Sequence, residues 1–179
     1  MSSLNRRTLL VLLAPLALAA CGFTPVHTAG GTGDALYGQI TVQAPEDIQS
    51  TSEVDSYLLV QNLEHRLGRA GAGTFQLDLT LSTRDDGQAI TDDSQITRYA
   101  ILGKASYTLT RKSDGKVVAS GDEEAFTGYS ATGSTVETLA SERDAHQRLM
   151  VILADQINAR LLTTVDLSAD PVPATAPPA

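Results

Sequence analysis

The residue with the clearest chemistry is Cys21, the only cysteine among 179 residues. The run Leu18-Ala19-Ala20-Cys21 matches a lipobox, in which the cysteine thiol is acylated and the small residues before it fit a signal peptidase. Two arginines precede an apolar run, Leu9 to Ala20. That run is too short for a membrane-spanning helix, which needs about 20 apolar residues. The sequence therefore predicts a lipoprotein signal peptide at residues 1–20 and lipidation at Cys21.

Acylation of Cys21 would fix both the location of the protein and the chemistry left to it. Acyl chains contribute about 0.8 kcal/mol per buried methylene, so several chains would hold the protein on a membrane. In enteric-type bacteria an aspartate after the cysteine retains a lipoprotein at the inner membrane, and Gly22 therefore favours the outer membrane. An acylated thiol is excluded as nucleophile, metal ligand or disulfide partner. The alternative is an ordinary secretory signal with an unrelated cysteine.

The other reactive side chains form no catalytic or metal-binding pattern. His27 lies near the chain start, and we expect His65 and His146 to be solvated on helix surfaces, because no pair has metal-ligand spacing. No serine lies in a Gly-x-Ser-x-Gly nucleophile motif. Carboxylates at 85–86 and 122–124 have no aromatic sugar platform nearby, which favours a solvated or edge-protecting role. We therefore predict no enzymatic activity, no metal and no cofactor.

A group of basic residues stands out against an acidic background. The chain carries a net charge of −8, and removal of residues 1–20 leaves 11 basic and 21 acidic residues, a net charge of −10. Such a charge disfavours nucleic acid and anionic membranes as general partners. Five basic residues within 19 positions could nevertheless form a local site for an anionic partner such as lipid phosphate, or could be ordinary exposed side chains guarding a hairpin. They are Arg98, Lys104, Arg111, Lys112 and Lys116.

Hydrophobic periodicity predicts the strands that would position this group. Residues 38–44 predict a short strand, and 75–82 alternate strictly between apolar and polar side chains. A polar loop is expected over 85–93. Residues 95–110 and 116–129 predict two strands joined by a turn at Ser113-Asp114-Gly115. With an unbroken register, one face of the third strand would carry Tyr99, Ile101, Ala105, Tyr107 and Leu109.

Two helices are predicted by capping boxes followed by apolar stripes. Ser52-Glu53-Val54-Asp55 and Ser134-Thr135-Val136-Glu137 both fit a capping box, which satisfies the free amides of a helix start. The first helix would run to about Arg69 and the second to about Thr163. The first stripe comprises Val54, Leu58, Leu63 and Leu67, widened by Leu59 and Val60. The second comprises Leu149, Ile152, Leu153, Ile157 and Leu161.

The element order predicts the fold class and the domain limits. Strand, helix, three strands and helix indicate an α+β two-layer sandwich, with two helices on one face of a roughly four-stranded antiparallel or mixed sheet. This domain would span residues 38–167. A lipidated N-terminus and flexible tether would occupy 21–37, and a disordered tail rich in Pro and Ala would occupy 168–179.

The chain resembles the lipopolysaccharide-assembly lipoprotein family LptE in its alphaproteobacterial form. The resemblance rests on the element order and on short segments: Cys21-Gly22-Phe23-Thr24-Pro25, residues 98–109, Gly128-Tyr129-Ser130 and the helix through residues 144–161. It implies an outer-membrane lipoprotein that catalyses no reaction. Such a protein partners and plugs the β-barrel LptD, helps it to assemble and helps to deliver lipopolysaccharide to the outer leaflet.

The resemblance also implies direct contact with lipopolysaccharide, for which the five basic residues named above are the candidates. A different binding module remains the alternative, namely an auxiliary lipoprotein of a phospholipid-type ABC transport system. It too would combine a lipobox with a small α+β domain. A barrel partner favours the first reading and a solute-binding partner favours the second.

Overall fold

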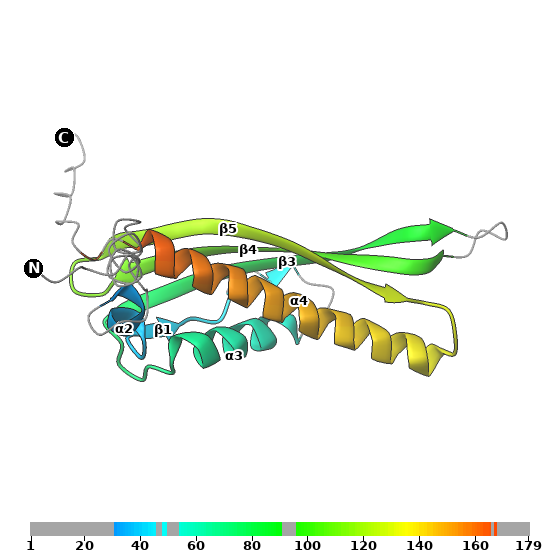
Figure 1. Ribbon diagram of the computed structural model, residues 1–179, viewed down its shortest axis with the longest axis horizontal. Coiled ribbons are helices and arrows are strands. Elements are labelled where there is room, and N and C mark those ends of the chain that lie inside the picture. The colour runs from blue at the N-terminus through cyan, green and yellow to red at the C-terminus, as the bar shows by residue number, and fades with distance from the viewer. Residues whose placement is uncertain (1–30, 46–47, 50–53, 91–95, 166, 168–179) are drawn as a thin grey trace, which may run out of the picture.

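The computed structural model describes residues 31–45, 48–49, 54–90, 96–165 and 167, which form an elongated two-layer domain (Figure 1). One layer is a β-sheet. The other consists of helices α3 (Asp55–Leu67) and α4 (Thr135–Thr164), which lie on the same face of that sheet. The predicted α+β class and the packing of both helices on one face are confirmed.

The sheet is mixed, as its connections require. Strands β1 (Ile40–Val42) and β2 (Ile48–Gln49) both pair parallel to β3 (Phe75–Ile90). Strands β4 (Ile96–Arg111) and β5 (Lys116–Ser130) continue the sheet antiparallel, in the order β1-β3-β4-β5. The parallel pair arises because a crossover through α3 separates β1 from β3, whereas hairpins join the later strands.

The core lies between the sheet and the two helices. Side chains at alternate positions of β4 are buried against the helices, as the pattern of that strand predicts. Ile101, Ala105, Tyr107 and Leu109 are at most 4% exposed, while Tyr99 is half-buried. At the far end of the hairpin Gly115 has a φ of 69°, in agreement with the predicted turn.

The polar loop predicted over residues 85–93 is wrong for its first half. Strand β3 continues to Ile90, and Asp85 and Asp86 pair with Ile101 and Ala100 of β4. Both aspartates are exposed. The ladder hydrogen bonds involve only the backbone, so exposed acidic side chains do not interrupt them. Residues 91–95 lie outside the described part of the chain.

Helix α3 differs from its prediction at its start and in its buried stripe. Its N-cap residue is Val54, which makes no side-chain capping bond, and Ser52 lies outside the described residues. Val54 is 54% exposed, and Leu58 is only half-buried. The buried stripe is instead rotated, and it consists of Asp55, Leu59, Leu63 and Leu67.

Helix α4 begins as predicted, with a complete capping box. The Glu137 backbone N–H donates to Ser134 Oγ at 3.3 Å, and the Ser134 N–H donates to Glu137 Oε2 at 2.8 Å. The helix has 30 residues and is therefore about 45 Å long. Leu149, Leu153, Ile157 and Leu161 are fully buried, whereas Ile152 is half-buried.

The packed domain begins before residue 38. A short helix, α2 (Thr32–Leu36), lies within the segment predicted as a tether, and Leu36 is only 1% exposed. Leu36 belongs to the core cluster that contains Leu59 and Leu63 of α3. A single well-buried leucine among glycines and threonines gave too little periodicity for this helix to be predicted.

Candidate functional site

The face of the sheet opposite the helices carries the most prominent surface feature. No described element covers this open face, so its side chains are accessible. The register aligns three strands here: Arg84 of β3 lies beside Leu102 of β4, which lies beside Phe126 of β5. In the next row, Ser82, Lys104 and Glu124 are aligned in the same way.

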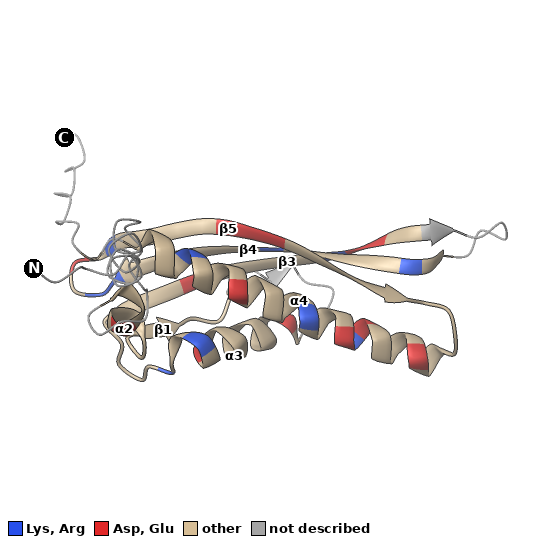
Figure 2. Cartoon of the chain, in the orientation of Figure 1, with Lys and Arg blue, Asp and Glu red and all other residues tan. Residues whose placement is uncertain are grey.

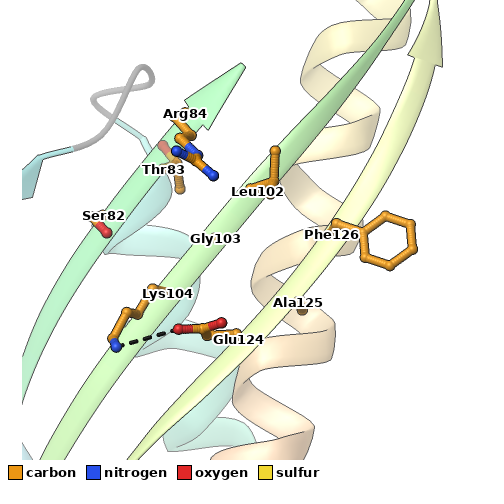
Figure 3. Close-up of a pocket in the computed structure, with 9 residues that line it drawn as sticks. All are labelled: Ser82, Thr83, Arg84, Leu102, Gly103, Lys104, Glu124, Ala125 and Phe126. Carbon is orange, nitrogen blue, oxygen red and sulfur yellow. Dashed lines mark ion pairs between the residues drawn. The ribbon is translucent and has the colours of Figure 1, made fainter. Parts of the chain in front are cut away.

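These two rows form a hollow of about 630 Å³. Figure 3 shows the side chains of Arg84, Leu102, Lys104 and Phe126 projecting from the strands, with the helices behind them. Phe126 is 74% exposed, an unusual state for a large apolar side chain, and Leu102 is half-buried beside it. The hollow therefore offers an apolar strip with cations at its border.

A second hollow of about 430 Å³ adjoins the first and shares Leu102 and Phe126 with it. Arg98 and Asp86 contribute to its lining. Within the described residues, Arg84 and Arg98 form no ion pair, so both guanidinium groups are available to bind an external anion. Lys104 Nζ lies 3.3 Å from Glu124 Oε1, and both side chains are well exposed.

The five basic residues predicted as one group separate into two sets. Arg98 and Lys104 belong to the open face. Arg111, Lys112 and Lys116 lie at the β4–β5 turn, about 40 Å from Arg98 at about 3.3 Å per residue. Figure 2 shows basic residues both at this turn and at the far end of the sheet, with acidic residues along β5 and α4.

The residues at the turn have structural contacts of their own. Arg111 Nη1 pairs with Asp114 Oδ2 at 3.2 Å, and Lys112 Nζ donates to Thr41 Oγ1 at 3.0 Å. The Lys116 backbone N–H donates to Asp114 Oδ1 at 3.2 Å. These contacts tie the turn to itself and to β1, so the open face is the better candidate for binding an anion.

Sequence reasoning missed Arg84, Leu102 and Phe126. Arg84 was missed because it directly precedes Asp85 and Asp86, which the sequence predicts to begin a loop. Leu102 and Phe126 were missed because they lie in different strands, and the sequence does not show that they are neighbours. Alternate residues of a strand point to the same face of a sheet, so all three side chains could be placed together once the strands are aligned. That alignment requires the β3–β4 and β4–β5 registers.

The expectation of a solvated His146 is wrong. His146 is 4% exposed and Asp55 is fully buried, with His146 Nδ1 at 2.9 Å from Asp55 Oδ2. The hydrogen bond from Asp55 raises the pKa of His146 above its ordinary value, although burial opposes the change. His65 is exposed, as predicted. His27 and Cys21 lie outside the described residues.

The described residues hold no group of three His, Cys, Asp or Glu side chains that could bind a metal ion. Among the same residues, none of the helices combines the length and hydropathy needed to span a membrane.

Comparison with known proteins adds a family to this geometry. A family model described as LptE, lipopolysaccharide-assembly, matches residues 37–161. Among solved structures, the chain is similar to a lipoprotein from Caulobacter crescentus CB15, at 18% identity and a TM-score of 0.59, covering 75% of this chain and 94% of that one. It is also similar to lipoprotein B from Nitrosomonas europaea, at 7% identity and a TM-score of 0.51, covering 77% and 90%. At such identities these two likenesses concern the fold alone. No curated protein matches the chain.

Proposed function

The chain belongs to the LptE lipopolysaccharide-assembly family, and on that basis we propose that it is the outer-membrane lipoprotein that partners and plugs the LptD β-barrel. In this role it helps the barrel to assemble and helps lipopolysaccharide to reach the outer leaflet. The role consists of binding and positioning, and no reaction is catalysed. The family match supports it, because residues 37–161 include β1 to β5, α3 and most of α4.

We propose that Cys21 carries the lipid anchor. Nine residues separate Cys21 from the N-cap of α2 at Gly31. Acylation at this position would keep the domain beside an outer-membrane partner, and Cys21→Ser should abolish labelling of the protein with a radioactive fatty acid.

The open sheet face is the proposed contact for lipopolysaccharide. Lipopolysaccharide carries phosphates next to acyl chains, which is the combination that the hollow offers. Leu102 and Phe126 supply apolar surface, while Arg84, Lys104 and Arg98 supply positive charge on either side. Charge-assisted hydrogen bonds from guanidinium groups to phosphate are among the stronger polar contacts in proteins. The single observation that carries this assignment is the exposed Phe126 among these cations.

Purification from native membranes in mild detergent tests the barrel partnership. We expect a large outer-membrane barrel to elute with the lipoprotein. Absence of any such barrel would contradict the proposal. A solute-binding protein in its place would favour the alternative, an auxiliary lipoprotein of a phospholipid-type ABC transport system.

A pair of charge-matched double variants tests the lipid contact. Arg84→Glu with Lys104→Glu should weaken binding of purified lipopolysaccharide at least about tenfold, because two charge-assisted contacts are reversed. Lys112→Glu with Lys116→Glu changes the same charge at the β4–β5 turn and should leave the affinity nearly unchanged. Both variants should retain the barrel. Equal affinities for lipopolysaccharide would remove the open face as its site.

A second matched pair of variants tests the apolar part of the same contact. Phe126→Ser removes an aromatic ring from the hollow, whereas Val117→Ser removes a 51% exposed apolar side chain elsewhere on β5. Only the first should weaken lipopolysaccharide binding. Equal losses for both variants would mean that β5 contributes no specific apolar contact.

A further inference from the structure

The ion pair between Asp55 and His146 joins three elements of the covered side. Asp55 is the first residue of α3, and His146 lies in α4. The Thr83 hydroxyl of β3 donates to Asp55 Oδ2 at 3.3 Å, the same oxygen that contacts His146. Val54 provides no side-chain cap, and the contacts of Asp55 fasten the start of α3 to β3 and α4.

The pair stands in a core that is otherwise almost entirely apolar. Among the described residues, the only other buried polar side chains are Thr83 and Thr127, and the Thr127 hydroxyl donates to the Ala145 carbonyl at 3.0 Å. Thr83 contacts Asp55 of α3, and Thr127 contacts Ala145 of α4. The interaction of two opposite charges is strong in such a low-dielectric interior, and an unpaired charge is correspondingly costly.

Charged groups from neighbouring elements also act on His146. Asp85 of β3 and Glu142 of α4 both add negative potential at His146. Together with the hydrogen bond to Asp55, they favour the protonated imidazole and raise its pKa, against the opposing effect of burial.

Two tyrosines lie beside these acidic groups at the same end of the interior. The rings of Tyr99 of β4 and Tyr129 of β5 stack with centroids 5.3 Å apart. Burial, with the charges of Glu142 and Asp85, raises the pKa of Tyr129 to about 12. Tyr129 therefore stays neutral at any pH where His146 titrates, and His146 is the group that changes its charge.

We propose that Asp55 and His146 form a proton-operated latch, which fastens the first turn of α3 to α4 and β3 when His146 is protonated and loosens that turn when the proton leaves. Loss of the proton removes the attraction between the two charges and leaves the Asp55 carboxylate buried beside a neutral ring. The apolar contacts of Leu59, Leu63 and Leu67 do not change, so the rest of the domain stays folded. The latch rests on this geometry alone and not on the proposed function.

The direction of the pH dependence follows from linkage. A histidine whose pKa is raised by folding stabilises the folded state fully below its unfolded pKa, and this contribution is lost as the pH rises through the folded pKa. The latch is therefore closed in mildly acidic conditions. It opens as the pH rises above the ordinary range of histidine.

Backbone hydrogen exchange of the full-length protein tests the latch. Protection of amides 58–61 in α3, after division by the intrinsic exchange rates, should fall between about pH 5 and pH 8, because the stabilisation from protonated His146 is lost as the pH rises through its folded pKa. Amides 153–157 in the centre of α4 should change much less. His146→Asn keeps a donor near the position of Nδ1 but cannot titrate, and it should abolish the pH dependence. His65→Asn, at an exposed histidine of α3, should behave like the unchanged protein.

Titration of the His146 ring by NMR gives a test that needs no variant. We expect its midpoint to lie above the ordinary value of about 6.5. A midpoint at or below that value would overturn the latch, and so would pH-independent protection of amides 58–61 in the unchanged protein. These readouts remain decisive if His146→Asn fails to fold.

Discussion

The two faces of the sheet are built from alternate residues of the same strands, yet they serve different purposes. In β4, Ile101 and Leu109 are completely buried beneath the helices, whereas Lys104 points to the open face and is exposed. In β5, Thr127 is buried beside Phe126, which is 74% exposed. The covered face thus determines the fold. The open face carries polar and charged side chains and leaves even the large apolar Phe126 exposed.

The largest contrast between the faces should come from matched leucine truncations. Leu149→Ala on α4 removes a fully buried side chain that packs on the covered face, and it should destabilise the protein by about 2–5 kcal/mol. Leu102→Ala on the open face removes a half-buried side chain and should cost about 1 kcal/mol. Urea unfolding of both variants measures the two values. Equal losses would mean that the open face is also part of the core.

The close approach of α4 to the sheet gives the next largest effect. A Cβ atom at Gly103 would lie 3.0 Å from Leu149 Cδ2 and 3.2 Å from Leu153 Cδ1. Gly103→Ala should therefore destabilise the domain by about 1–3 kcal/mol through overpacking. Gly71→Ala is the control, because a Cβ there meets nothing within 4 Å. A Gly103→Ala variant as stable as its parent would show that α4 can shift away from the sheet without cost.

A smaller effect is expected at the start of α4, beyond both faces. Ser134→Ala removes the hydroxyl that accepts from the Glu137 N–H and should cost about 1 kcal/mol. Ser120→Ala, at an exposed position of β5, should have almost no effect. Thermal unfolding of both variants distinguishes them. A neutral Ser134→Ala would indicate that packing alone fixes where α4 begins.

Features that depend on neighbouring residues could be predicted from the sequence. The capping box of α4 needs only Ser134 and Glu137, three residues apart, and the buried side chains of β4 follow from simple alternation. The fold class followed from the order of such local elements. Helix α3 was predicted close to its observed position, but its stripe was rotated because all six candidate residues are apolar and one of the four buried positions is the acid Asp55.

Features that depend on distant partners could not be predicted. The burial of His146 depends on Asp55, which lies 91 positions earlier in the chain. A histidine between charged neighbours on a helix looks solvated until that partner is placed. The open-face hollow likewise depends on the registers of three strands, so only Lys104 and Arg98 of its cations were selected, and Arg84 was not.

The smallest expected effect concerns the ion pair between Lys104 and Glu124 on the open face. Their side chains are 49% and 72% exposed, and such exposed pairs contribute about 0–1 kcal/mol because water screens them. A double-mutant cycle with Lys104→Met and Glu124→Gln should therefore give a coupling energy below about 1 kcal/mol. This weakness is what a binding face requires, because Lys104 can leave Glu124 for a phosphate at little cost. A coupling energy above about 2 kcal/mol would make Lys104 a structural residue, and it would then transfer the proposed anion contact to Arg84 and Arg98.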